Sequence, residues 1–229
     1  MGRVIYTVVI GQAIERLARL TLPRMQRYAD RCGADLVIYQ KNTTDGPHFS
    51  KFDAIIQGYE RGYEQLLFLD ADILVANDDE DIFNEYTCAL HDESVTPVGE
   101  PSRILACAFA EIRRNFDPDF TPPYYNSGVM LFDRQTMEPL AKRLQEIERI
   151  RLVLWDQCQL NWHLRVIGAP AQNMAAKWNY QYSWTQRDGR TVFPDDLRFL
   201  HFCGTEYGDK TPMVQQVCSE LGIRSSDKS

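Results

Sequence analysis

Gln65-Leu66-Leu67-Phe68-Leu69-Asp70-Ala71-Asp72 is the segment that says most about the fold of this chain. The run Leu66–Leu69 is apolar without alternation, which predicts a strand buried on both faces, as in a parallel sheet. Side chains two positions apart on a strand point the same way, so Asp70 and Asp72 would face one spot where this strand ends. Open α/β sheets bind ligands at this carboxyl end. The segment therefore predicts an α/β fold with a polar site beside these two aspartates.

The two carboxylates also indicate what such a site would bind. Asp70 and Asp72 would repel each other unless a cation or a shared proton resolved the conflict. A hard divalent cation that takes oxygen ligands would remove this repulsion, and the same cation could bind phosphate groups. A structural alternative is that Asp70 caps the strand and Asp72 begins a turn, because D-x-D is a short motif.

The composition narrows the class of protein without selecting a function. A chain of 229 residues that is 44% hydrophobic can bury the core of one α/β domain. The net charge of −7 argues against a nucleic-acid partner, which usually meets a basic face. No stretch has the apolar length of a membrane span, and the six cysteines form no C-x-x-C pair, as suits reduced core thiols. Met1–Ile10 looks like a first strand rather than a signal peptide, so we expect a cytoplasmic protein, with peripheral membrane attachment left open.

The first half of the chain shows a β-α-β-α-β pattern, which predicts a parallel sheet with right-handed crossovers. The expected strands are Val4–Ile10, Leu36–Tyr39 and Gln65–Leu69. Pro23 should kink or divide the first helix, and Gly33 should end it. Ser50 should open the second helix, which should run to about Gly62, with Asp53 completing an imperfect capping box.

The second half is less regular, but no repeat or low-complexity linker interrupts it. Its expected elements are strands at Cys88–Leu90, Gly128–Phe132 and Arg198–Phe202, a loop at Pro97–Pro101, a helix with Met137, Leu140, Leu144 and Ile147 on its buried face, a short helix at Asp156–Leu164, and a closing helix with Met213, Val214, Val217 and Leu221. We therefore assign residues 1–224 to one domain and residues 225–229 to a flexible tail.

Three downstream segments strengthen the interpretation of D-x-D. They are Tyr125-Asn126-Ser127-Gly128-Val129-Met130-Leu131-Phe132, Asp156-Gln157-Cys158-Gln159-Leu160-Asn161 and Leu200-His201-Phe202-Cys203-Gly204. In this order and spacing, the four segments resemble the GT-A glycosyltransferases of the glycogenin and lipopolysaccharide galactosyltransferase type, a glycosyltransferase family 8-like group. Those enzymes carry D-x-D at a strand end, then N-[SA]-G before an apolar strand, D-Q-x-x-L-N, and H-[FY]-x-G. The resemblance covers about residues 3–205.

The resemblance implies a single GT-A domain, Rossmann-like, with a mixed and mostly parallel sheet flanked by helices. It also implies transfer of a hexose from a nucleotide-sugar donor, such as UDP-glucose or UDP-galactose, with retention of anomeric configuration. In that family the D-x-D carboxylates and the late histidine hold Mn²⁺ against the donor pyrophosphate, and they match Asp70, Asp72 and His201. Imidazole beside carboxylates favours Mn²⁺, with Mg²⁺ as the alternative. Taken alone, His201 would equally suit a core histidine in an apolar strand.

Further positions match residues that contact the donor in the family. Asn126, Asp156 and Gln157 correspond to positions at the donor sugar or near the anomeric carbon, so Asp156 and Gln157 are candidate catalytic residues. Asp156 alternatively suits a helix N-cap. The remaining implied donor contacts are Thr7 and Gly11, where the family seats the uridine, together with Ala71, Ser127 and Gly204.

Two lysines are candidates for the donor phosphates. Lys51 falls in the first turn of the helix after Ser50, where the helix dipole disfavours a cation unless an anion is present. The family has a lysine in this helix that binds the donor, and the alternative is a lysine facing solvent. Relatives also carry a lysine two or three residues after H-x-x-G, whereas Lys210 follows Gly204 by six. Either a longer loop lets Lys210 reach the leaving phosphate, or Lys51 and the metal suffice.

Other functions stay open at this point. A haloacid dehalogenase-type phosphatase also carries D-x-D after an apolar strand, although normally after the first strand of its domain. A non-catalytic nucleotide-sugar-binding domain on the same fold is a second alternative. The acceptor, whether a glycan, a lipid-linked sugar or a small molecule, is not specified by these motifs. Six aromatic residues could stack on sugars or belong to the core: Tyr124, Tyr125, Trp178, Tyr180, Tyr182 and Trp184.

Overall fold

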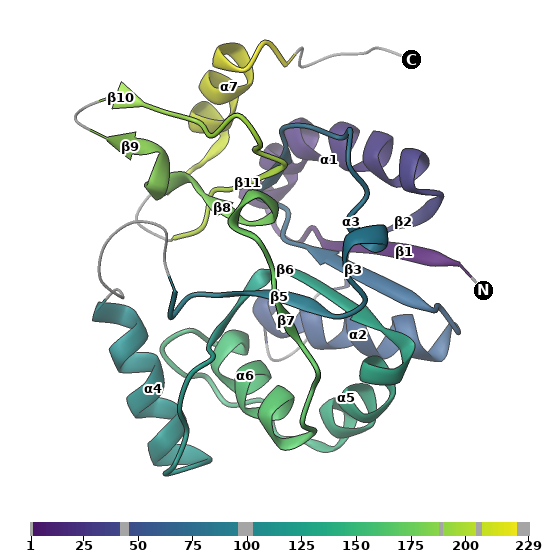
Figure 1. The fold of residues 1–229 in the computed structure, drawn as a ribbon, viewed down its shortest axis with the longest axis vertical. Helices are drawn as coiled ribbons and strands as arrows, with labels where there is room; N and C mark the ends of the chain where they lie inside the picture. Colours follow the sequence, from purple (N-terminus) through teal and green to yellow (C-terminus); the bar gives the residue numbers. More distant parts are fainter. Residues whose placement is uncertain (1, 42–45, 96–102, 188–189, 205–207, 224–229) are drawn as a thin grey trace.

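A six-stranded sheet forms the centre of the protein (Figure 1). The computed structural model describes residues 2–41, 46–95, 103–187, 190–204 and 208–223. The strand order is β2-β1-β3-β6-β5-β7. These strands are Arg3–Val8 (β1), Ala34–Tyr39 (β2), Gln65–Leu69 (β3), Ala89–Asp92 (β5), Tyr125–Asp133 (β6) and Gln172–Asn173 (β7). β6 runs antiparallel to both of its neighbours, whereas the pairs β1–β2, β1–β3 and β5–β7 are parallel. This is the mixed, mostly parallel sheet that the sequence predicts.

Helices cover both faces of this sheet (Figure 1). One face packs against α1 (Gln12–Cys32), and the other packs against α2 (Ser50–Glu60), α5 (Arg134–Glu146) and α6 (Asp156–Val166). Leu66 and Phe68 of β3 belong to the core cluster that includes α2 and α5, whereas Leu67 and Leu69 pack with α1. All four side chains are fully buried. The strand is apolar without alternation because both of its faces are covered.

A second, three-stranded sheet places His201 beside the D-x-D segment. Its order is β4-β11-β8, formed by Ile73–Val75, Phe199–His201 and Tyr180–Gln181. β11 pairs antiparallel with β4 so that His201 lies opposite Ile73, the residue directly after Asp72. Thus two segments that are far apart in the sequence meet at the end of β3.

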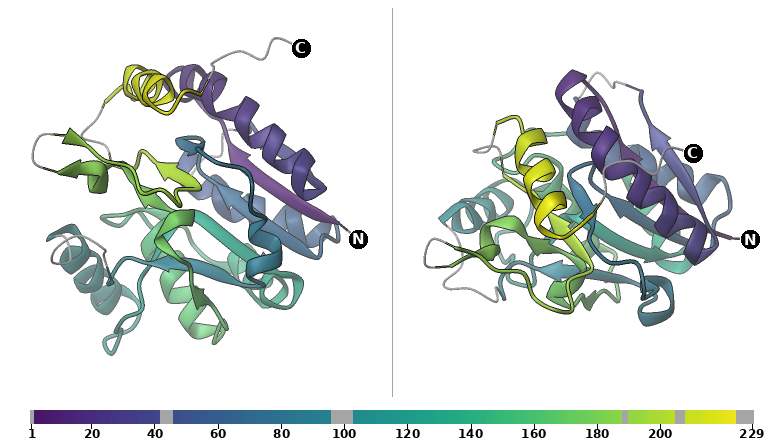
Figure 2. Two further views of the ribbon diagram at one scale, coloured as in Figure 1. Left: turned by 45° about the horizontal axis from the view of Figure 1, so that its top comes forward. Right: turned by 90° about the horizontal axis from the view of Figure 1, so that it is seen from above.

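The remaining elements pack around these two sheets. They are α3 (Ile82–Glu85), α4 (Arg103–Asn115), α7 (Thr211–Glu220), the hairpin of β9 (Gln186–Arg187) and β10 (Arg190–Thr191), and 3-10 helices at Pro47–Phe49, Ala176–Trp178 and Tyr182–Thr185. Leu17 of α1 shares a core cluster with Val214 and Val217 of α7. Figure 2 accordingly shows α7 beside α1 in both views.

Two local predictions need correction. Pro23 does not divide α1, which continues from Gln12 to Cys32, and both Pro23 and Arg19, whose carbonyl loses its helical partner, are exposed residues. Ser50 does not cap α2, because the preceding 3-10 helix Pro47–Phe49 runs directly into it. Asp53 instead accepts hydrogen bonds from Tyr39 and Arg149, at 3.2 Å and 2.5 Å.

Most of the other predicted elements are present with shifted ends. Gly33 ends α1 in a left-handed conformation, with φ of 62°, as expected for a C-terminal glycine cap. The second helix ends at Glu60, and the predicted strand Cys88–Leu90 is observed as Ala89–Asp92. The predicted loop Pro97–Pro101 and the tail 225–229 lie outside the described residues.

Candidate functional site

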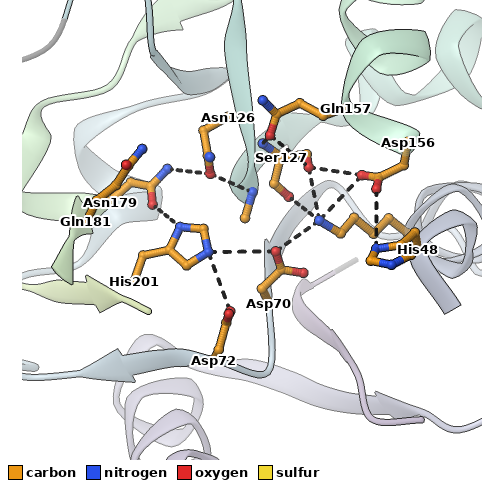
Figure 3. A network of polar contacts seen from close by, with 12 residues as sticks. His48, Asp70, Asp72, Asn126, Ser127, Asp156, Gln157, Asn179, Gln181 and His201 are labelled. Carbon is orange, nitrogen blue, oxygen red and sulfur yellow. Dashed lines mark hydrogen bonds and ion pairs between the residues drawn. The ribbon is translucent and has the colours of Figure 1, made fainter. Parts of the chain in front are cut away.

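The predicted polar residues gather where β3 ends. Asp70 directly follows β3, and its backbone N–H donates to the carbonyl of Gly128 in β6 at 2.8 Å. Because β6 is antiparallel to β3, its first residues, including Asn126 and Ser127, lie at the same end of the sheet as Asp70. Figure 3 shows these side chains converging with Asp72, Asp156 and His201.

Asp70, Asp72 and His201 form a candidate metal site. Each offers one ligand atom, and these atoms all lie within 4.8 Å of one another. His201 Nε2 is 3.5 Å from Asp72 Oδ1 and 3.9 Å from Asp70 Oδ2. Oδ1 of Asp72 is buried and has no hydrogen-bond partner among the described residues. A buried carboxylate oxygen without a donor is costly, and a cation at this point would satisfy it.

Gly128 makes room for the imidazole of His201. A Cβ atom at Gly128 would lie 2.2 Å from Cε1 of His201 and 2.8 Å from each ring nitrogen. No carbon pair tolerates such a separation, so only glycine fits here. The glycine of the N-[SA]-G segment thus has a steric role that the motif alone did not reveal.

Lys51 is buried rather than facing solvent, which removes that alternative. Its Nζ donates to Asp70 Oδ2 at 2.9 Å and to Ser127 Oγ at 3.0 Å, and lies 3.4 Å from Asp156 Oδ2. Burial opposes the ammonium form, but the carboxylates of Asp156 and Asp70 outweigh it and raise the pKa of Lys51. Lys51 therefore stays charged in the interior of the site.

Lys210 also reaches the site, although its position in the sequence departs from the family pattern. Its Nζ donates to Asp72 Oδ2 at 2.7 Å. Burial opposes ionisation of Asp72, yet His201 in its charged form and Lys210 lower the pKa of this carboxyl below its usual range. Burial raises the pKa of Asp70, in spite of Lys51. Two lysines thus hold the two carboxylates of the D-x-D segment.

Asp156 and Gln157, at the start of α6, face Ser127. Ser127 Oγ donates to Asp156 Oδ2 at 2.9 Å, and Ser127 N–H donates to Gln157 Oε1 at 3.0 Å. Asp156 does not cap α6, because Trp155 occupies the N-cap position and Asp156 is the first helical residue. Its carboxylate instead serves the site, where the dipole of α6 also favours a negative charge.

Backbone strain occurs immediately before Asp156. Trp155 has φ of 44° and is the one described residue other than glycine with positive φ. Its ring stacks on His48 with centroids 4.8 Å apart, and His48 Nδ1 lies 4.0 Å from Asp156 Oδ1. Such strain costs about 1–3 kcal/mol and is typical of functional sites. The sequence analysis did not identify His48, which stands in a segment without a recognisable motif.

The other predicted donor contacts lie outside this cluster of side chains. Thr7 is buried in β1 and its hydroxyl has no described partner, whereas Gly11 is exposed with φ of 94° at the start of α1. Ala71 is buried, and its carbonyl accepts from Thr21 at 2.8 Å. Gly204, with φ of 104°, is exposed after β11. Each lies on a segment next to the cluster, and among the described residues no side-chain hydrogen bond links them to it.

Two further residues complete the polar network, and the sequence analysis missed both. Glu93, just after β5, accepts from Asn126 Nδ2 at 2.8 Å, Gln157 Nε2 at 2.9 Å and Gln181 Nε2 at 2.9 Å. Asn179, just before β8, donates through Nδ2 to Asn126 Oδ1 at 2.9 Å, and its Oδ1 lies 2.9 Å from His201 Nδ1. Polar residues after a predicted strand were a usable signal for Glu93, as for Asp70. Asn179 carried no such signal.

Most of the candidate aromatic residues belong to the core. Tyr124 and Trp178 are fully buried, and Tyr180 and Trp184 are nearly so. Tyr125 and Tyr182 are half-buried. Stacking on a sugar ring is therefore limited to the exposed part of these two side chains.

The comparison with known families agrees with this geometry. The model of glycosyl transferase family 8 matches residues 49–206, well over half of the 229 residues. This chain belongs to glycosyl transferase family 8. The matched range includes the segments that supply Lys51, Asp70, Asp72, Asp156 and His201. A haloacid dehalogenase-type phosphatase is excluded, consistent with the D-x-D segment following the third strand rather than the first.

Solved structures share the fold of this family 8 glycosyltransferase. One similar structure is the crystal structure of a glycosyltransferase involved in the glycosylation of the major capsid of PBCV-1, with a TM-score of 0.62 and 15% identity. The alignment covers 94% of this chain and 100% of that one. At such low identity the likeness speaks for the GT-A fold alone. No curated protein matches the sequence. Within the described part of the glycosyltransferase, none of the helices combines the length and apolar character that crossing a bilayer requires.

Proposed function

We propose that this family 8 glycosyltransferase transfers a hexose from a UDP-sugar to an acceptor hydroxyl, requires a divalent cation, and retains the anomeric configuration. The observation that carries the proposal is the convergence of Asp70, Asp72 and His201 within 4.8 Å at the carboxyl end of β3. Ligands of open α/β sheets bind at this end.

The residues of this triad fit a divalent metal. Two carboxylates and one imidazole suit Mn²⁺, which accepts both oxygen and nitrogen ligands, better than Mg²⁺. The unpartnered Oδ1 of Asp72 and the Nε2 of His201 face each other at 3.5 Å. When bound, the cation would neutralise charge on the nucleoside diphosphate leaving group as a Lewis acid.

The two lysines supply further positive charge for a diphosphate. Lys51 and Lys210 each hold one D-x-D carboxylate in the structure, at 2.9 Å and 2.7 Å. When a cation takes over these carboxylates, each ammonium group would become available for a phosphate oxygen. We therefore assign Lys51 and Lys210 to the donor phosphates, together with Gly204, six residues before Lys210.

The polar residues of β6 and α6 are assigned to the transferred sugar. Asn126, Asp156 and Gln157 present amides and a carboxylate, which pair well with sugar hydroxyls. Asp156 is buried with its Oδ2 3.4 Å from Lys51 Nζ, and a carboxylate placed there would stabilise positive charge at the anomeric carbon. Thr7 and Gly11 at the end of β1 are assigned to the uridine, and Ala71 and Ser127 to the donor beside the D-x-D segment.

A screen of donor hydrolysis tests this function. The protein with Mn²⁺ is incubated with a panel of UDP-, GDP-, ADP- and dTDP-hexoses, and nucleotide release is measured, because water can replace a missing acceptor. We expect slow release of UDP from one UDP-hexose, and proton NMR should first detect the released hexose in the anomeric form of the donor. Asp156→Asn is the matched control, which should release no UDP while remaining folded.

The screen separates the outcomes of this proposal. UDP binding without release, also with candidate acceptors, would indicate a non-catalytic nucleotide-sugar-binding protein. Release of another nucleotide would overturn the donor assignment, and appearance of the inverted anomer would overturn retention. The acceptor classes to be tested next are glycans, lipid-linked sugars and small molecules.

A further inference from the structure

A directional chain of hydrogen bonds leads from Glu93 to His201. Its members are the side chains of Glu93, Asn126, Asn179 and His201, joined at 2.8 Å, 2.9 Å and 2.9 Å. Asn126, Asn179 and His201 are 5%, 0% and 3% exposed, so water does not substitute for these contacts. We propose that this chain makes Asn179 a positioning residue, which holds His201 in the tautomer that can bind a metal. The inference rests on the metal site of the proposed function.

The orientation of Asn126 is fixed by two independent partners. The backbone N–H of Gly128 can only donate, and it lies 2.8 Å from Asn126 Oδ1. The Glu93 carboxylate can only accept, and it lies 2.8 Å from Asn126 Nδ2. Glu93 therefore faces the amide nitrogen, and Gly128 faces the amide oxygen. A flipped Asn126 would lose both bonds.

The orientation of Asn126 determines that of Asn179. Because Asn126 presents Oδ1, the neighbouring amide must donate, and Asn179 Nδ2 does so at 2.9 Å. The oxygen of Asn179 then points to Nδ1 of His201 at 2.9 Å. An amide oxygen only accepts, so Nδ1 of His201 must carry the proton.

A proton on Nδ1 leaves Nε2 of the neutral imidazole as a bare lone pair. This nitrogen faces Asp72 Oδ1 at 3.5 Å and Asp70 Oδ2 at 3.9 Å. Metal ligation requires the bare nitrogen, and a partner on the other nitrogen commonly fixes tautomer and ring orientation. In the opposite tautomer, an N–H group would point into the metal position. Asn179 thus prepares His201 for the cation before it arrives.

The other described histidines provide internal references for a test. His91 Nδ1 lies 3.1 Å from the carbonyl of Met174, which only accepts, so His91 should also carry its proton on Nδ1. His163 Nδ1 accepts from Arg143 Nε at 2.7 Å, so His163 should carry its proton on Nε2. Neither contact involves Asn179. The chain has four histidines in all, which makes their ring signals separable.

The test is ¹⁵N NMR of the histidine rings in the metal-free protein, at a pH well above the ordinary imidazole pKa of about 6.5. In the wild type, His201 should show a protonated Nδ1 and a bare Nε2. Asn179→Leu, which keeps the size of the side chain, should give a mixture of tautomers or the reverse tautomer at His201 only. Its affinity for Mn²⁺, measured by calorimetry, should fall about 10–100-fold. Asn179→Asp keeps an acceptor at Nδ1, although it cannot donate to Asn126, and it should also keep the proton on Nδ1.

The measurements on the wild type alone can overturn the inference. A protonated Nε2 at His201 in the metal-free wild type contradicts it, whether or not the Asn179 variants fold. Unchanged His201 signals and Mn²⁺ affinity in a folded Asn179→Leu protein would also contradict it. The predicted tautomer with no Mn²⁺ binding would refute the proposed function instead, whereas Mn²⁺ binding with the opposite tautomer would refute only the role of Asn179.

Discussion

Replacing Gly128 by alanine should expel His201 from the metal site. The added Cβ would lie 2.2 Å from Cε1 of His201, whereas carbon atoms in contact are normally about 3.5–4.0 Å apart. The imidazole would have to retreat by more than about 1 Å. It is 3% exposed and held by Asn179, so it has no free space to enter without breaking that contact. Gly128→Ala should therefore remove the imidazole from the two carboxylates.

The expected magnitudes follow from two opposing terms. Overpacking in a buried region costs about 1–3 kcal/mol. An alanine at a position without positive φ regains about 0.4–1 kcal/mol through the unfolded state. The net destabilisation should be up to about 2.5 kcal/mol, which lowers Tm by up to about 10 °C in a chain of this size. Loss of the imidazole should weaken Mn²⁺-dependent UDP binding by at least about 10-fold.

Calorimetry of UDP binding at constant Mn²⁺, together with thermal unfolding, checks this prediction. Gly58→Ala is a matched control, because its Cβ would lie 2.3 Å from Leu66 Cδ1 in a part of the core away from the site. It should shift Tm without changing UDP affinity. In a double-mutant cycle, His201→Ala should relieve the strain of Gly128→Ala and restore stability, but not UDP binding. A folded Gly128→Ala protein that binds UDP as tightly as the wild type would show that His201 is not a metal ligand.

The remaining predictions concern three buried or half-buried cations and bases. Lys51→Met leaves Asp70 and Asp156 without their shared ammonium, so it should lower both stability and UDP affinity, the latter by about 1.5–3 kcal/mol in calorimetry. In the absence of UDP, Lys210→Met should bind Mn²⁺ more tightly than the wild type, because no ammonium group competes for Asp72. The same variant should bind UDP more weakly, because a cation that faces the diphosphate is lost. Changes of the same sign in both affinities would contradict the assignment of Lys210 to the donor phosphates. Burial, and then the charge of Arg143, lower the pKa of His163 to about 4. The stability that neutral His163 provides is therefore complete above pH 6.5 and is lost as the pH falls towards 4. Denaturant unfolding at pH 7 and pH 4 measures this effect. Between these pH values, the free energy of unfolding should fall by about 3 kcal/mol more in the wild type than in His163→Phe. An equal fall in both proteins would refute the lowered pKa of His163.

Features that depend on neighbouring residues in the sequence could be predicted well. The apolar run before Asp70 predicted a strand covered on both faces, and β3 has helices on both sides. The segments with Asn126, Asp156 and His201 were assigned to one site because their motifs, in this order and spacing, resemble those of a glycosyltransferase family. Their convergence follows from the order of elements in an α/β sheet.

Features that depend on long-range pairing could not be predicted from sequence. The partners of Asn179 lie 53 and 22 residues away, and their contacts exist only because the starts of β8 and β6 lie beside the end of β11. Lys210 was in doubt because spacing along the chain measures the length of a loop and not where its end returns. Gly128 is one residue within a recognised motif, but its contact with His201 becomes apparent only when β11 is placed beside β4.

The metal dependence of UDP binding tests the central claim most directly. Asp70, Asp72 and His201 are taken to bind a cation that joins the protein to the donor diphosphate. Calorimetry with wild-type protein should show UDP binding in Mn²⁺ and a large loss of affinity in a chelator, and Asp72→Asn should lose most of the affinity that Mn²⁺ provides. Equal UDP affinity with Mn²⁺ and with the chelator would contradict the account.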